Sequence, residues 1–203
     1  MLHIRHWLPI LITMLWLTNG AAQSISKEVR QDILKAVVQI IPFDNTSGEM
    51  APWSGSGTII SPDGYILTNF HVIGDLDTRQ HFEFHAILTT DPNFTDQPPV
   101  FSYWARYVAS DPTHDLAILK IVEFADETPV PESLQFVSVT VGDSNELFPG
   151  DLITIVGYPG ISGSTVTFTA GLMSGWLGED FEAGGKQWIK TDAKIAHGNS
   201  GGA

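Results

Sequence analysis

A serine set among glycines near the end of the chain is the feature that most constrains the fold. It lies in the segment His197-Gly198-Asn199-Ser200-Gly201-Gly202-Ala203. Small residues let the backbone turn sharply, and they leave a hydroxyl clear of neighbouring side chains. They also let main-chain N–H groups converge on one point, as an acyl-transfer site requires. Because glycine–serine segments are also ordinary turns, the serine needs partners elsewhere in the chain.

The position of Ser200 in the chain decides which kind of nucleophilic site can form. The pattern Gly-x-Ser-x-Gly also fits the nucleophile elbow of α/β-hydrolases, in which the acid and the histidine follow the serine. Only Gly201, Gly202 and Ala203 follow Ser200 in this chain. Any acid and base must therefore come earlier, in the order His, Asp, Ser, unless a second set lies beyond Ala203.

Among the seven histidines, only His71 lies in a frame suited to a general base. Residues 55–61 predict a strand, Pro62-Asp63-Gly64 predicts a hairpin turn, and residues 65–69 predict the returning strand. His71 comes directly after this second strand, where a rigid element can hold an imidazole in place. A lone histidine there is more often structural, so His71 needs a carboxylate partner.

Asp115 is the carboxylate that best meets this need. It opens residues 115–121, a near-continuous apolar run that predicts a buried strand. A carboxylate at the mouth of such a strand is unfavourable unless it is hydrogen-bonded, and an imidazole N–H is a fitting donor. The rival is Asp111, but Asp111-Pro112 is typical of a turn. Without His71 and Ser200, an ordinary strand-edge aspartate would be the simpler interpretation of Asp115.

With these motifs in this order, the chain resembles the trypsin-like serine peptidases, most closely the HtrA (Deg) branch. Similarity extends from about Ala36 to the end and includes residues 141–144 and 150–160. The resemblance implies an all-β fold of two six-stranded barrels, the second one incomplete here. The strongest matches are Gly-Ser-Gly-Thr-Ile-Ile (55–60), Leu-Thr-Asn-Phe-His-Val (67–72), Asp-Leu-Ala-Ile-Leu (115–119), Thr-Asp-Ala (191–193) and Gly-Asn-Ser-Gly-Gly (198–202).

The resemblance also implies an activity and the residues that perform it. A triad of His71, Asp115 and Ser200 would lie between the barrels, and the backbone N–H groups of Gly198 and Ser200 would form the oxyanion hole. The implied function is a secreted serine endopeptidase that forms an acyl-enzyme on extended or unfolded polypeptides, without metal or cofactor, in protein quality control. A non-catalytic protein that captures exposed strands on the same scaffold is the alternative. The resemblance leaves oligomerisation open.

Two further positions concern activation and specificity. Asn199 occupies the place where digestive trypsins carry an aspartate that pairs with a new N-terminus, so activation by that route is not expected. Lys194 lies six residues before Ser200, the place of the pocket floor in trypsin-like folds. An inward Lys194 would select acidic side chains, but an unpaired buried ammonium is unfavourable. The preferred alternative turns Lys194 outward and lets Ile195 line an apolar pocket.

Composition narrows the classes of partner. The chain has 10 basic and 23 acidic residues and a net charge of −13, which disfavours nucleic acid and anionic membranes. It has no cysteine, which excludes disulfides and thiolate zinc sites. Alternation places His81, Glu83 and His85 on one strand face. These three could bind zinc, but we interpret them as the solvent face of a half-buried strand.

The organisation along the chain follows from the same patterns. Residues 1–22 predict a signal peptide, and their apolar core is short for a membrane span, although an uncleaved anchor is the alternative. The mature protein is therefore expected in the periplasm or outside the cell. Residues 23–133 should hold a short helix (24–34, capped by Ser24 or Ser26), the first barrel and a linker (123–132), and residues 134–203 should begin the second barrel. We expect more strands after Ala203, often followed by a PDZ domain, so residues 1–203 alone are expected to be inactive.

Overall fold

The computed structural model describes residues 25–160, 165–178 and 188–203. The predicted signal peptide lies outside these residues. Within them, no helix has the length and apolar character needed to cross a membrane. In chain order the elements are α1 (Lys27–Ala36), β1 (Val37–Asp44), β2 (Glu49–Met50), β3 (Gly55–Ile59), β4 (Tyr65–Thr68), α2 (Phe70–Ile73), β5 (Phe84–Thr89), β6 (Val100–Asp111), β7 (Leu116–Phe124), the 3₁₀ turn η1 (Ser144–Glu146), β8 (Leu152–Gly157), β9 (Thr167–Leu177) and β10 (Trp188–Thr191).

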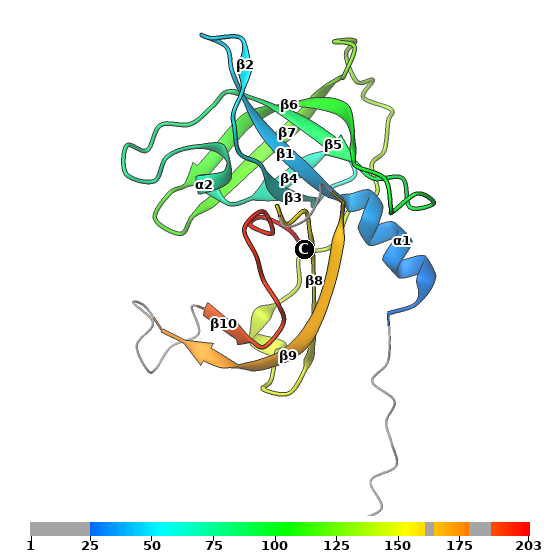
Figure 1. Ribbon diagram of the computed structural model, residues 1–203, viewed down its shortest axis with the longest axis vertical. Helices are drawn as coiled ribbons and strands as arrows, with labels where there is room; N and C mark the ends of the chain where they lie inside the picture. Colours follow the sequence, from blue (N-terminus) through cyan, green and yellow to red (C-terminus); the bar gives the residue numbers. More distant parts are fainter. Residues whose placement is uncertain (1–24, 161–164, 179–187) are drawn as a thin grey trace, which may run out of the picture.

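The N-terminal helix α1 begins at its predicted cap. The hydroxyl of Ser26 accepts a hydrogen bond from the Val29 N–H at 3.3 Å, and so satisfies one of the free donors at the helix start. Leu34 and Ala36 are buried against the body of the protein. The β-branched residues Val37 and Val38 follow, and the chain continues directly into β1 because such side chains favour a strand. Figure 1 shows α1 at the side of the barrel that β1 enters.

Six strands close into the first barrel, in the order β1-β3-β4-β7-β6-β5, and β1 pairs again with β5. All of these pairings are antiparallel. The barrel encloses one apolar cluster that includes Ile40, Ile66 and Leu119, each 0% exposed. A side chain at Gly57 would meet Ile40 and Ile66 at 2.6 and 2.7 Å, so the tight core needs glycine there. The predicted all-β architecture is confirmed.

The predicted hairpin between β3 and β4 also forms. Gly64 adopts a φ of 91°, a conformation that favours glycine, and the Ile60 N–H donates to the Tyr65 carbonyl at 2.8 Å. The strand β7 extends to Phe124, into the first residues of the predicted linker. Farther along, the Phe136 N–H donates to the Pro62 carbonyl at 2.8 Å, which holds this part of the chain against the β3–β4 turn.

A second antiparallel sheet, in the order β10-β9-β8 among the described residues, lies beside the barrel. Tyr158, directly after β8, joins the two parts: it is 1% exposed, and its hydroxyl pairs with that of Thr90 at 2.9 Å and donates to the Val37 carbonyl at 3.3 Å. On β8, Val156 exchanges two backbone hydrogen bonds with Ala203, at 2.8 and 3.0 Å. The C-terminal loop therefore lies between the barrel and the second sheet (Figure 1).

The interpretation of His81, Glu83 and His85 as a solvent face is wrong for His85. Its side chain is 0% exposed, because on β5 it lies on the same face as Ile87, which belongs to the apolar cluster inside the barrel. Neither ring nitrogen of His85 has a hydrogen-bond partner among the described residues. His81 is exposed and stacks on Tyr107 with 3.7 Å between ring centroids. No group of three potential metal ligands occurs in the described part of the chain.

The buried imidazole of His85 makes stability depend on pH. Burial lowers the pKa of His85 from 6.5 to about 3; the Ala105 backbone opposes this effect, and the nearby His81 adds to it. The ring stays neutral in the folded protein, whereas in the unfolded chain it binds a proton below about pH 6.5. The unfolded state then holds more protons than the folded state. We therefore expect the free energy of unfolding to decrease as the pH falls below about 6.5, by up to about 1.4 kcal/mol per pH unit.

Urea unfolding of wild type and His85→Leu at pH 7 and pH 5 measures this contribution. These pH values lie above the range in which aspartates titrate, so the difference between wild type and His85→Leu isolates the contribution of His85. Wild type should lose more stability between the two conditions than His85→Leu does. An identical loss in wild type and His85→Leu would contradict the prediction.

Candidate active site

The helical turn α2 presents His71 on a firmly seated element. Phe70, Val72 and Ile73 are 0%, 2% and 0% exposed, so the turn is anchored in the barrel core. His71 lies on the opposite side, and 43% of its side chain is exposed. A side chain at Gly55 would come within 2.5 Å of Val72, so the close approach of β3 to α2 depends on this glycine. The imidazole therefore stands at the surface on a rigid base.

Asp115 holds this turn through its backbone and its side chain. Its carbonyl accepts hydrogen bonds from the Asn69 side-chain amide at 2.8 Å and from the Phe70 N–H at 3.1 Å. Its Oδ1 accepts from the His71 N–H at 2.8 Å, and its Oδ2 lies 2.6 Å from Nδ1 of His71. The residue has a φ of 55°, in the left-handed region that aspartate tolerates better than most residues. The start of β7 is thus shaped to receive α2.

This contact determines which ring nitrogen of His71 is free. An ionised carboxylate can only accept hydrogen bonds, so Nδ1 carries the hydrogen that points to Asp115. The other nitrogen, Nε2, is then left with a lone pair and can accept a proton. The rival carboxylate, Asp111, is occupied elsewhere: its Oδ2 pairs with Nδ1 of His114 at 2.6 Å within the turn before β7. Asp115 is therefore the carboxylate that meets His71.

The loop that carries Ser200 is fastened to β3 by Ser56. The Ser56 N–H donates to the Ser200 carbonyl at 2.8 Å, and the Ser56 hydroxyl donates to the Gly198 carbonyl at 2.6 Å. The same hydroxyl accepts from the Tyr158 N–H at 2.9 Å. Ser56 is 0% exposed, so these bonds are shielded from water. One buried serine on the first barrel thus positions both sides of Ser200.

Glycine is required directly after Ser200. Gly201 has a φ of 81°, and a side chain there would lie 2.2 Å from the Ser56 carbonyl oxygen and 2.3 Å from the Thr68 hydroxyl. These distances are too short for any side chain without a shift of β3 or β4. The loop can therefore lie against these strands only because the residue has no Cβ.

Two N–H groups beside Ser200 remain available for an oxyanion. Among the described residues, the N–H groups of Gly198 and Ser200 donate no hydrogen bond, whereas that of Asn199 donates to the Ala196 carbonyl at 3.1 Å. The His197 carbonyl accepts from the Gly160 N–H at 2.8 Å. Because a trans peptide points its C=O and N–H in opposite directions, the Gly198 N–H faces away from Gly160. This orientation leaves the Gly198 donor free.

The predicted site residues differ in how closely the structure joins them. His71 and Asp115 are in direct contact, but no hydrogen bond joins the side chains of His71 and Ser200 within the described ranges. The Ser200 loop is instead attached to β3, which pairs with β4, the strand that leads into α2. Lys194 is exposed and Ile195 is 63% exposed, and the Thr169 hydroxyl donates to the Lys194 carbonyl at 2.9 Å. Their part in specificity stays a prediction.

Three positioning residues escaped the sequence analysis. Ser56 and Asn69 stand within recognised motifs, yet a motif does not show which polar side chain turns inward to bind a distant loop. Tyr158 joins the two sheets, and burial raises the pKa of its phenol, which therefore keeps its hydrogen over the physiological range. The sequence did contain one signal for the role of Ser56. It is a small hydroxyl residue between Gly55 and Gly57, and glycines on both sides allow another segment to approach it closely.

The chain is similar in sequence to known proteins. Residues 55–203 match the family described as trypsin-like peptidase domain. Three relatives share the name "Probable periplasmic serine endoprotease DegP-like". Those of Brucella suis and Marinomonas sp. are 37% and 38% identical over 73% of this chain, and that of Rickettsia conorii is 31% identical over 91% of it. The chain spans only 24%, 26% and 33% of the lengths of these three relatives, respectively.

Replacement of Ser56 by alanine should loosen the Ser200 loop. The Tyr158 N–H and the Gly198 carbonyl would lose their buried partner, which should lower the free energy of unfolding by about 1–3 kcal/mol. Hydrogen exchange should become faster at residues 196–202 before it changes elsewhere. The exposed Ser174 on β9 offers a matched control, and Ser174→Ala should leave both measurements unchanged. Unaltered exchange in the loop of Ser56→Ala would refute its anchoring role.

Proposed function

Because the chain belongs to the trypsin-like peptidase family, we propose that it carries the triad of a serine endopeptidase. Ser200 is the nucleophile, His71 the general base and Asp115 the residue that orients the imidazole. The observation that carries this proposal is the 2.6 Å contact between Asp115 and Nδ1 of His71, which leaves Nε2 free to take a proton. The firm attachment of the Ser200 loop to the same barrel supports it.

The reaction proceeds through an acyl-enzyme in two stages. Ser200 Oγ attacks the carbonyl carbon of the scissile peptide while Nε2 of His71 takes the hydroxyl proton. The N–H groups of Gly198 and Ser200 hold the oxyanion of the tetrahedral intermediate. His71 then gives its proton to the leaving nitrogen, and the C–N bond breaks. A water molecule, deprotonated by His71, releases the acyl group and restores the Ser200 hydroxyl.

Asp115 acts through the charge and geometry of His71. Its carboxylate keeps the hydrogen on Nδ1, and it stabilises the imidazolium that exists between the two proton transfers. The hydrogen bond from Ser200 to His71 is assigned to the substrate-bound state, since such catalytic contacts often tighten only when substrate is in place. The attachment of α2 and of the Ser200 loop to neighbouring strands of one barrel supports this assignment.

The substrates of this activity are polypeptides bound as extended strands along the site. We propose that Ile195 contributes to an apolar pocket for the residue before the scissile bond, with the ammonium of Lys194 in solvent. The relatives are named periplasmic, and the predicted signal peptide at residues 1–22 agrees with export of this protein. An exported endopeptidase that acts on unfolded chains would serve protein quality control.

The replacement Ser200→Ala in the full-length protein tests the proposal. Triad members act as a unit, so turnover should fall by a factor on the order of 10⁴ to 10⁶. The fold should be retained, because the hydrogen bonds of this loop use the backbone of Ser200 and not its hydroxyl. The measurement is kcat/KM on unfolded casein, with thermal unfolding of both proteins as the control. A kcat/KM of Ser200→Ala within tenfold of wild type would contradict the assignment of Ser200 as the nucleophile.

A further inference from the structure

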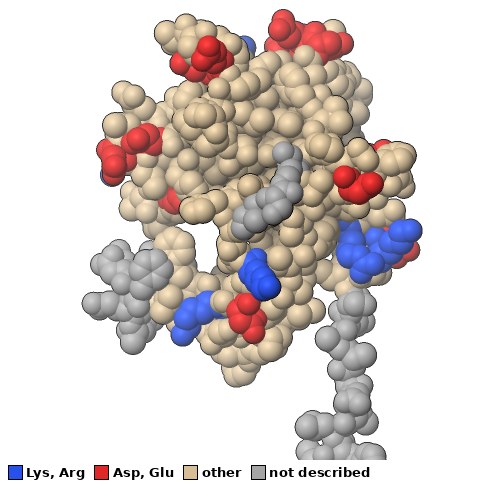
Figure 2. Space-filling view, in the orientation of Figure 1, with Lys and Arg blue, Asp and Glu red and all other residues tan. Residues whose placement is uncertain are grey.

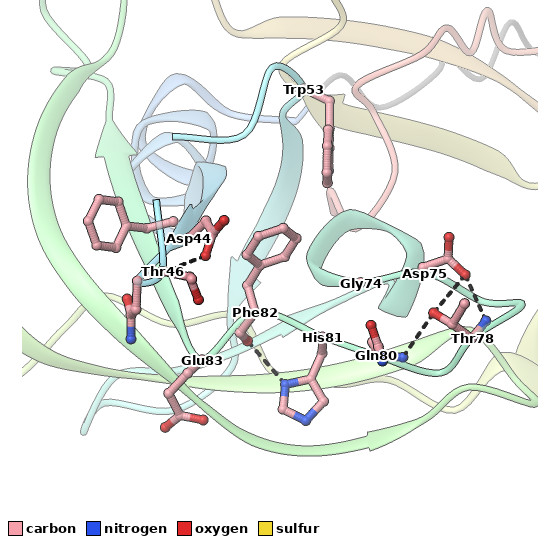
Figure 3. A pocket seen from close by; sticks show the side chains of 12 residues that line it. Asp44, Thr46, Trp53, Gly74, Asp75, Thr78, Gln80, His81, Phe82 and Glu83 are labelled. Carbon is pink, nitrogen blue, oxygen red and sulfur yellow. Dashed lines mark hydrogen bonds between the residues drawn. The ribbon is translucent and has the colours of Figure 1, made fainter. Parts of the chain in front are cut away.

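A cavity of about 690 Å³ lies next to α2, on the first barrel. One side of it is formed by the turn that follows β1, with Asp44, and the other by Gly74 and Asp75, directly after α2. Figure 3 shows the Asp44 and Asp75 carboxylates on opposite sides of the Phe82 ring. Since α2 also carries His71, the cavity is close to the catalytic imidazole but is formed by other residues.

Two aromatic rings in this cavity are held in fixed positions. The indole N–H of Trp53 donates to the Val72 carbonyl at 3.1 Å, which ties the ring to the residue after His71. Trp53 meets Phe82 edge to face, with 5.8 Å between ring centroids and a 67° angle between planes. Trp53 is nonetheless 43% exposed. A rigid, accessible indole of this kind suits a cation, which the face of an aromatic ring attracts.

The charges of the cavity point to the same class of ligand. Asp44, Asp75 and Glu83 line it, whereas no Lys or Arg is among its described lining residues. Arg79 is exposed and does not line it. Hydrogen bonds from the N–H groups of Thr46 and Thr78 lower the pKa of Asp44 and of Asp75, so both carboxylates remain charged in mildly acidic solution. The cavity therefore offers negative charge and aromatic surface together.

The wider charge distribution favours the same occupant. On the face shown in Figure 2, most Asp and Glu side chains stand around the first barrel, while most Lys and Arg side chains lie over α1 and the second sheet, with acidic side chains beside them. With a net charge of −13, the protein attracts basic segments in general. The cavity adds a defined place at which one basic side chain can be held.

We propose that this cavity binds a lysine or arginine side chain of the polypeptide substrate, on the leaving-group side of the scissile bond; this inference rests on the proposed function. His71 protonates the leaving nitrogen, so the residues after the scissile bond begin beside His71 and extend past α2. The cavity opens beside this helix, within reach of such residues. A basic side chain there would lie against Trp53 and near Asp75.

Cleavage of matched peptides by the full-length protein measures the preference for a basic side chain after the scissile bond. The peptides share one sequence up to the scissile bond and carry lysine, norleucine or glutamate at one of the three following positions. At low salt, kcat/KM should be about fivefold to tenfold higher for the best lysine peptide than for its norleucine counterpart, and lower for glutamate. The lysine preference should shrink in 0.5 M salt, because exposed charges are screened over about 10 Å or less.

A matched pair of variants locates the effect. Asp75→Asn keeps the oxygen that accepts the Thr78 N–H at 2.8 Å, so the loop is preserved while the charge is removed. Asp126→Asn is the control, because its Oδ1 accepts the Thr128 N–H at 3.0 Å in a similar turn outside the cavity. Asp75→Asn should reduce the lysine preference at least threefold and leave the norleucine rate within twofold of wild type. The control should behave as wild type.

Binding of the same peptides to the Ser200→Ala protein separates this inference from the proposed function. Tighter binding of the lysine peptide, weakened by Asp75→Asn, supports the cavity even if no peptide is cut. Equal affinities for the lysine and norleucine peptides overturn the inference whether or not wild type cleaves them. Failure of wild type to cleave any peptide or casein overturns the proposed function alone.

Discussion

Four hydrogen bonds converge on Asp115 from the consecutive residues Asn69, Phe70 and His71, and the site depends on them. Two are accepted by its carbonyl and two involve its carboxylate. Asp115, directly before β7, therefore holds the whole start of α2 in place. The left-handed φ of 55° turns both groups toward the helix. Removal of the carboxylate would leave the backbone contacts in place but free the imidazole to rotate. Asp115 thus both stabilises α2 and orients the exposed side chain of His71.

The second constraint is that His71 and the Ser200 loop are held by neighbouring strands of the same sheet. β3 carries Ser56, which fastens the Ser200 loop, and β3 pairs with β4, which leads into α2 and pairs in turn with β7. Their relative placement is therefore set by neighbouring strands of one barrel and by the hydrogen bonds of Ser56. The second sheet contributes through Val156 on β8, which exchanges two backbone hydrogen bonds with Ala203, and through Tyr158 directly after β8, whose N–H donates to the Ser56 hydroxyl. Glycines at the closest approaches make this arrangement sterically feasible.

Much of the fold and of the candidate site could be predicted from the order of motifs. The remaining features depend on how distant segments pack together in the folded protein. The hairpin before His71 and the glycine-rich Ser200 loop are local patterns, so residue types alone indicate them. His85 was misassigned because simple alternation cannot tell which face of β5 turns inward when the barrel closes. The anchoring role of Ser56 was missed because its partner, Gly198, lies 142 residues away. The aromatic and acidic cavity combines three separate segments, and no sequence window contains them together.

The central claim is that His71 and Asp115 activate one serine, Ser200. Treatment of the full-length protein with a fluorophosphonate, followed by peptide mass spectrometry, reads this directly, because such reagents phosphonylate an activated serine hydroxyl. The account predicts one adduct, on Ser200, whose formation becomes far slower in a folded His71→Ala variant. An adduct on another serine, or labelling of Ser200 that is equally fast without His71, would contradict it.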